Sequence, residues 1–148
     1  MRLTIFSILF CFFLYSCKKE DKMSNVPKIK FSTITDKIKA GEGTINLSFE
    51  FEDGDADMGN NPNTPEIFVY NLKDTSEALY PFPSDIPDGF KDPSKGMKGV
   101  ATIAMSGAFF TLDSLHANGD SVNFMVFIKD EAGNKSNEIF TTFVKINP

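Results

Sequence analysis

The sequence contains no tryptophan, one histidine and only two cysteines, Cys11 and Cys17. It also lacks the pattern G-x-S-x-G of serine hydrolases and the pattern H-E-x-x-H of zinc proteases. No motif with a pair of cysteines, of the kind that thiol chemistry requires, is present either. The histidine, His116, lies in the polar stretch LHANGD with no nucleophile motif beside it. We therefore predict that the chain is not an enzyme. A glycan-active enzyme that uses paired carboxylates is the weaker alternative, because 20 acidic residues single out no pair.

An excess of positive charge is also missing. The chain has 15 basic and 20 acidic residues and a formal net charge of −5. Nucleic acids and anionic lipid headgroups are recognised by clustered lysine and arginine. The charge balance therefore argues against both as partners.

No hydrophobic run is long enough to cross a bilayer, which takes about 20 apolar residues. The longest, LTIFSILFCFFLY at 3–15, follows Arg2 and is typical of a secretory signal peptide. It ends in LYSC at 14–17, which resembles the lipobox of bacterial lipoproteins. This resemblance implies that residues 1–16 are removed and that the Cys17 thiol carries the acyl chains. A truncated membrane anchor with an incidental cysteine is the alternative.

The residues after Cys17 suggest a destination for the protein. The stretch CKKED resembles the export signal of Bacteroidota lipoproteins, with Lys19, Glu20 and Asp21 in the matching places. The resemblance implies an outer-membrane lipoprotein that faces the extracellular side, anchored to the membrane through its N-terminal lipid. A solvated charged linker is the other interpretation, since short charged motifs also arise by chance.

The mature chain divides into a short linker and one domain. Residues 17–27 comprise Cys17 and KKEDKMSNVP, which has little apolar content and is predicted to be a flexible tether. Residues 28–148 are long enough for one domain with its own core.

This domain is predicted to be all-β. In TINLSFEF at 44–51 apolar residues alternate with polar ones, which is typical of a strand with one buried face. Similar stretches occur at 28–34, 66–72, 99–107, 122–130 and 139–146, with a weaker one at 108–114. Turn-forming residues separate them. About seven short antiparallel strands predict a two-sheet sandwich with Greek-key connections.

Two segments carry a family resemblance. GDSVNFMVFIKDEAGNKSNEIFT at 119–141 resembles the last two strands and the intervening turn of bacterial immunoglobulin-like and fibronectin type III-like domains. FEDGDADMG at 51–59 is similar to a motif of small Bacteroidota surface lipoproteins with this architecture. The resemblance implies an immunoglobulin-like β-sandwich and no particular activity.

The stretch at 51–59 also holds three closely spaced carboxylates, Asp53, Asp55 and Asp57. Carboxylates this close repel one another unless water or a cation neutralises them, and calcium takes six to eight oxygen ligands. The loop is not an EF-hand, because Met58 occupies the position of the required glycine and Thr64 that of the required glutamate.

The predicted topology brings a second acidic loop to the first. If 44–51 and 122–130 are the second and sixth strands of a sandwich, the loops that follow them emerge at the same end. Asp130 and Asn134 would then approach Asp53, Asp55 and Asp57, with Asn60 or Asn61 completing the shell. These residues could hold a structural calcium ion. The interpretation that the sequence favours is that they form Asx turns without a metal.

The long connection at 73–98 contains four prolines and places Tyr80, Phe82 and Phe90 among carboxylates. A loop of this length is usually functional or disordered. Exposed rings there could stack on a sugar or grip a protein partner. Buried rings would instead close the edge of the sandwich, which is favoured because most aromatic residues are at least partly buried.

Together these features predict a lipid-anchored, surface-exposed, non-catalytic module that binds a glycan or a protein, as an adhesion or accessory domain. The alternative is a structural subunit that packs against an outer-membrane protein.

Overall fold

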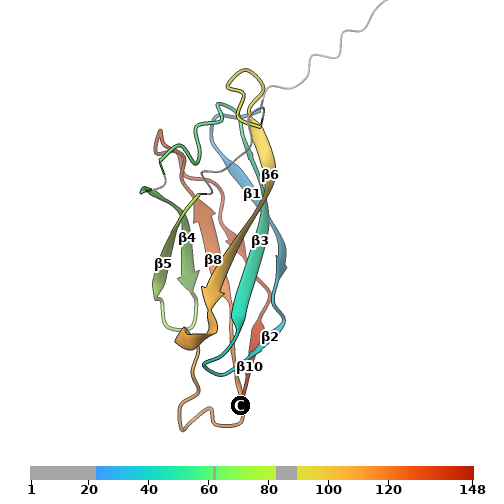
Figure 1. Ribbon diagram of the computed structural model, residues 1–148, viewed down its shortest axis with the longest axis vertical. Helices are drawn as coiled ribbons and strands as arrows, with labels where there is room; N and C mark the ends of the chain where they lie inside the picture. Colours follow the sequence, from blue (N-terminus) through green and yellow to red (C-terminus); the bar gives the residue numbers. More distant parts are fainter. Residues whose placement is uncertain (1–22, 62, 83–89) are drawn as a thin grey trace, which may run out of the picture.

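The computed structural model describes residues 23–61, 63–82 and 90–148, which fold into two facing β-sheets and a small third sheet (Figure 1). The first sheet has the order β1-β3-β6 and the second has the order β5-β4-β8-β9. The third, β2-β10-β7, is shorter. The strands are β1 (Lys28–Ile34), β2 (Lys37–Lys39), β3 (Thr44–Asp53), β4 (Pro65–Asn71), β5 (Glu77–Pro81), β6 (Met97–Ser106), β7 (Asp120–Val122), β8 (Phe124–Ile128), β9 (Ile139–Phe140) and β10 (Val144–Asn147).

The strand order is that of an immunoglobulin-like β-sandwich, as the sequence predicts. The chain crosses from β3 in the first sheet to β4 in the second, and from β5 back to β6. The third sheet continues the second beyond an interruption at Asn123, where Thr141 bonds Phe124 through both its amide and its hydroxyl group. Within it β2 runs parallel to β10, and β10 runs antiparallel to β7.

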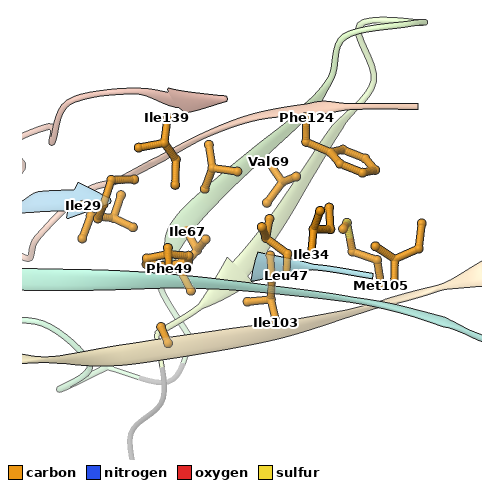
Figure 2. Packing of buried hydrophobic residues seen from close by; sticks show 14 of the residues in the cluster. Ile29, Ile34, Leu47, Phe49, Ile67, Val69, Ile103, Met105, Phe124 and Ile139 are labelled. Atoms are coloured by element: carbon orange, nitrogen blue, oxygen red, sulfur yellow. The ribbon is translucent and has the colours of Figure 1, made fainter. Parts of the chain in front are cut away.

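The core lies between the two large sheets and is built by the alternation that the sequence shows. In β3 the side chains of Ile45, Leu47 and Phe49 are fully buried, whereas the polar residues between them face outward. Ile67 and Val69 of β4 lie near Leu47 and Phe49 from the other sheet (Figure 2). Burial of one such side chain contributes about 1.5–3 kcal/mol, so these positions dominate the stability of the domain.

The predicted strands at 28–34, 44–51, 66–72 and 99–107 are confirmed to within a few residues. Those at 122–130 and 139–146 are each interrupted. The strand at 108–114 is wrong, because a 3₁₀ turn, η1 (Gly107–Phe109), begins there instead.

The sequence analysis missed two strands. β5 lies within the connection that was expected to be a loop, and β2 is only three residues long. Both are too short to show a clear period.

β3 and β8 run toward the same end of the sandwich, where β1 also begins, and the C-terminus lies at the opposite end (Figure 1). The end where β3 stops is called the acidic end below, because the loop at Asp53–Met58 and the loop at Asp130–Asn134 lie there. In the described part of the chain, no helix has the length and apolarity required to span a bilayer.

Candidate metal centre

Asp53 is buried because it occupies an inward position of β3. The residues on the core face of this strand are Ile45, Leu47, Phe49 and Phe51, and a period of two places Asp53 next. Its side chain is 0% exposed. The sequence therefore puts a carboxylate, not a hydrophobic group, at the end of a core strand.

Asp130 reaches the same place from the other sheet. The core face of β8 carries Phe124, Val126 and Ile128, and Asp130 follows in the same alternation. Since β3 and β8 run toward the same end of the sandwich, Asp53 and Asp130 come together there, between the two sheets.

Asp53, Asp55, Asp57 and Asp130 form one cluster, called the acidic centre below. One carboxylate oxygen from each lies within 4.8 Å of those of the other three. Among the residues that the structure describes, Asp53 Oδ1, Asp55 Oδ1 and Asp57 Oδ1 are buried and accept no hydrogen bond. Buried carboxylate oxygens without a partner are costly unless a cation or a proton satisfies them.

The backbone of the loop is shaped to bring these side chains together. Ala56 has a φ of 58°, in the left-handed region that alanine rarely adopts. This turn lets Asp55 and Asp57 on either side of it face inward. The Asp57 amide donates to Asp53 Oδ2 at 3.2 Å, and the Ala132 amide donates to Asp57 Oδ2 at 3.1 Å. The second bond ties the two acidic loops to each other.

Burial and mutual repulsion raise the pKa values of this centre. Burial, then the neighbouring Asp55 charge, raises the pKa of Asp53 from 3.8 to about 7. Burial and the Asp130 charge also raise the pKa of Asp57. A bound cation would lower both values, because it favours the ionised form.

A further carboxylate, Glu66, lies nearby. Its side chain is buried and accepts hydrogen bonds from the Gly59 amide at 2.9 and 3.2 Å, one to each oxygen. Burial raises its pKa, and the charges of Glu131 and Asp57 raise it further. Sequence reasoning missed Glu66, because a lone glutamate at the start of a strand gives no signal.

The last residues of the predicted tether pack on the acidic end. The Gly54 amide donates to the Ser24 carbonyl at 2.8 Å, and a side chain at Gly54 would come within 2.4 Å of the Met23 carbonyl oxygen. Pro27 is buried. Residues 23–27 therefore pack on the folded domain, whereas the sequence predicts that the whole of 17–27 is a flexible tether.

The predicted metal residues divide into two groups. Asp53, Asp55, Asp57 and Asp130 come together as predicted, but Asn134 supports Asp130. The Asn134 amide donates to Asp130 Oδ1 at 2.7 Å and its side-chain Nδ2 donates to Asp130 Oδ2 at 2.8 Å. This is the Asx-type turn that the sequence offered as the interpretation without a metal, and Gly133 in this turn has a positive φ of 88°.

Asn60 and Asn61, proposed to complete the shell, bond elsewhere. Asn60 Oδ1 accepts from Lys91 Nζ at 2.9 Å, and Asn61 Oδ1 accepts from the Asn63 amide at 3.0 Å.

The predicted ligand loop is not one exposed aromatic surface. Phe82 is 2% exposed and packs edge-to-face on Phe51 with ring centroids 4.9 Å apart, so its ring cannot stack on a ligand. Tyr80 is half-buried on the inner side of β5. Only Phe90 has a well-exposed side chain, at 58%. The alternation of β5 turns Ala78, Tyr80 and then Phe82 inward. The sequence favours burial of these rings, as found for Phe82, but it did not reveal the strand that buries them.

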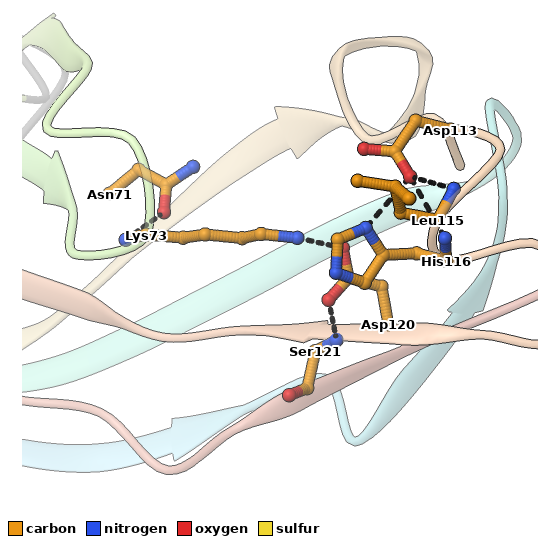
Figure 3. Close-up of polar contacts among 7 residues, drawn as sticks. All are labelled: Asn71, Lys73, Asp113, Leu115, His116, Asp120 and Ser121. Carbon is orange, nitrogen blue, oxygen red and sulfur yellow. Dashed lines mark hydrogen bonds and ion pairs between the residues drawn. The ribbon is translucent and has the colours of Figure 1, made fainter.

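His116 stabilises a turn near the other end of the sandwich (Figure 3). Its Nδ1 lies 2.8 Å from Asp113 Oδ1, which also accepts the amides of Leu115 and His116. Lys73 and Asp120 form an ion pair beside it. Cys17, Lys19, Glu20 and Asp21 lie outside the described residues.

No protein-family model matches the chain, and no curated protein is similar to it in sequence. Among solved structures it is similar to the PKD domain of an M14-like peptidase from a Thermoplasmatales archaeon, with 16% identity, a TM-score of 0.41, and coverage of 84% of this chain and 95% of that one. It is also similar to a Niemann-Pick type C2 protein from the Japanese carpenter ant, with 19% identity, a TM-score of 0.44, and coverage of 86% and 98%. At this level neither protein indicates what the present chain binds.

Proposed function

We propose that the chain is a lipid-anchored, non-catalytic binding module whose acidic end is held together by a structural calcium ion. The observation that carries the metal proposal is the set of buried, unpartnered carboxylate oxygens of Asp53, Asp55 and Asp57 beside Asp130.

The donor set fits calcium. The acidic centre offers only oxygen ligands, which hard cations prefer, and nitrogen or sulfur ligands of the kind zinc selects do not belong to it. Calcium–oxygen distances of about 2.3–2.6 Å place two opposite ligands about 5 Å apart. The donor oxygens of the acidic centre lie within 4.8 Å of one another, which agrees with that span.

The ion would act as a cross-link. Asp53, Asp55 and Asp57 follow β3, whereas Asp130 follows β8 of the other sheet. A single ion bound to all four would join the two sheets where the Ala132–Asp57 hydrogen bond already connects their loops. The role is therefore structural, and it does not require catalysis.

Calorimetric titration of the metal-free protein tests this proposal. We expect one calcium site with a Kd between micromolar and millimolar, and magnesium binding at least about tenfold weaker, because magnesium demands a tighter octahedral shell. Asp53→Asn should abolish the calcium heat. Equal affinity for the two ions, or unchanged binding by the variant, would contradict a calcium site here.

The membrane part of the proposal rests on Cys17 and the apolar segment before it. Intact-mass measurement of the protein purified from its native membrane should give a chain that begins at Cys17 and carries acyl groups. Cys17→Ser should move the protein out of the membrane fraction, because the acyl chains provide the anchoring free energy. A wild-type species that retains Met1 or carries no fatty acid would refute the anchor.

A second candidate, a subunit that docks on an outer-membrane protein, is favoured by the outer face of β5-β4-β8-β9. Leu79 and Phe140 are about half exposed on this face. Between these two residues, the Phe68 ring stacks on the Phe127 ring, with centroids 4.8 Å apart. Apolar surface of this kind often marks an interface. Co-purification with a membrane protein after mild detergent extraction would favour this candidate, and a clean monomer would oppose it.

A further inference from the structure

A pocket opens between the two sheets, away from the acidic end. Its lining residues come from the β4–β5 hairpin on one side and from the end of β6 with η1 on the other. Its volume is about 380 Å³, within the range of small-molecule sites. We call it the β5 pocket.

The inner surface of the β5 pocket is apolar and aromatic. The floor is formed by the buried side chains Val69, Met105 and Phe124. Tyr80 and Phe110 form half-buried walls, and the Phe110 ring meets Phe124 edge-to-face with centroids 5.9 Å apart. The Tyr80 and Phe110 rings remain partly exposed although they pack against the core.

Phe109 stands at the rim and is 83% exposed. A phenylalanine so exposed gains nothing from burial in the free protein. It is well placed to contact a molecule in the pocket.

The polar part of the rim is negatively charged. Asp74 and Glu77 line the opening, and no lysine or arginine is found among the described residues that line it. The Ser76 hydroxyl donates to Asp74 Oδ1 at 2.6 Å and lowers the Asp74 pKa, so this carboxylate is ionised at neutral pH. The Tyr70 hydroxyl donates to Glu77 Oε1, and this bond raises the Tyr70 pKa.

We propose that the β5 pocket binds a small organic cation, an alkyl or quaternary ammonium group with an apolar body. Aromatic rings attract such groups through their negative faces, and carboxylates at the rim add charge complementarity. An anion would be repelled by Asp74 and Glu77, and a strongly hydrated ion would gain nothing from the apolar floor. The proposal refines the binding role proposed above by naming the class of ligand.

Another hollow, of about 720 Å³, lies over β1, β3 and β6, but its two carboxylates are already paired and a third lysine, Lys98, also lines it. Lys28 lies 3.7 Å from Glu52, and Lys30 lies 3.4 Å from Glu50. It therefore lacks the free negative charge of the β5 pocket, and Phe51 is the one aromatic side chain among the described residues that line it.

Choline is the probe that tests the proposal, and 3,3-dimethyl-1-butanol is its neutral control of matching shape. Both are titrated by NMR into the mature chain with Cys17→Ser, which cannot carry the acyl groups. Calcium is present at a fixed excess, so that choline does not compete for the acidic centre. We expect choline to shift the ring signals of Tyr80, Phe109 and Phe110 with a Kd of about millimolar. The alcohol should bind at least about tenfold more weakly.

Two variants separate the contribution of the exposed aromatic ring to choline binding from that of the negative charge at the rim. Phe109→Ala should weaken choline about three- to tenfold, with little effect on folding because the ring is exposed. Asp74→Asn with Glu77→Gln should weaken it about tenfold. The matched control is Glu50→Gln with Glu52→Gln, which makes the same change of charge on the outer face of β3 and should leave choline binding unchanged.

Equal binding of choline and the alcohol would overturn the proposal, because charge would then play no part. Choline shifts confined to residues outside the pocket would overturn it as well. Neither result would affect the calcium site, which lies at the acidic end, or the proposed lipid anchor. Both are tested by separate measurements.

Discussion

Calcium should raise the melting temperature of the wild-type protein by more than about 10 °C, and it should leave that of Asp53→Asn almost unchanged. A ligand at 1,000 times its Kd stabilises the folded state by about 4 kcal/mol. For a domain of this size each kcal/mol corresponds to about 3 °C or more. Thermal unfolding with calcium and with a chelator measures the difference.

The same variant should have the opposite effect when no metal is present. In the metal-free protein at pH 8, ionised Asp53 is buried beside Asp55 and Asp57, and one of its oxygens accepts no hydrogen bond among the described residues. Asparagine removes this charge, keeps the shape, and can donate to a neighbouring carboxylate. We therefore expect Asp53→Asn to melt above the wild type in chelator and below it in calcium.

Glu52→Gln is the matched control for this crossover. Glu52 is the neighbouring residue on β3, but it is exposed and faces outward. The substitution makes the same change of charge and should shift neither melting temperature by more than about 2 °C. If Asp53→Asn melts below the wild type in chelator, the carboxylate stabilises the fold by an interaction other than metal binding.

The free energy of unfolding of the metal-free protein should fall by about 2–3 kcal/mol between pH 5 and pH 8. The pKa of Asp53 is 3.8 when unfolded and about 7 when folded. Between pH 3.8 and about pH 7, the Asp53 carboxyl group is ionised in the unfolded chain but protonated in the folded protein. Each rise in pH within this range therefore favours unfolding. The stabilisation is complete below the unfolded pKa and is lost as the pH passes the folded one.

Urea unfolding in chelator at several pH values measures this slope. The raised pKa values of Asp57 and Glu66 act in the same direction. Asp92, whose pKa is lowered to about 2 by its bonds to Ser94, titrates below this range and does not contribute. Saturating calcium should remove most of the slope in the wild type, and Asp53→Asn should reduce it without calcium. A stability that rises with pH in chelator would contradict a buried, metal-free Asp53.

The alternation of β3 and β8 made most of the fold predictable. In 44–51 and 122–130 every second residue is apolar, and this alternation indicates which face of each sheet meets the core. The turn-forming residues between these stretches indicate the number of strands. The same alternation places Asp53 two residues after Phe51 and Asp130 two residues after Ile128, both on the core face. Their burial was therefore also encoded locally.

Other features depended on contacts between distant segments. β5 is too short to show a period, and it is a strand because β4 pairs with it, which is why Phe82 turned out to be buried. Residues 23–27 pack on the domain because Gly54 leaves space for their backbone. The β5 pocket joins residues from β4 to β8 that no sequence window contains.

The sequence by itself determined an all-β sandwich, its strand faces, and the presence of two aspartate-rich loops, because these follow from local periodicity and turn chemistry. Only the tertiary structure decided that four carboxylates meet within 4.8 Å and that three of their oxygens are buried without a hydrogen-bond partner among the described residues. The physical reason is that burial and charge repulsion depend on the distance between side chains. That distance is set only when the two sheets pack against each other.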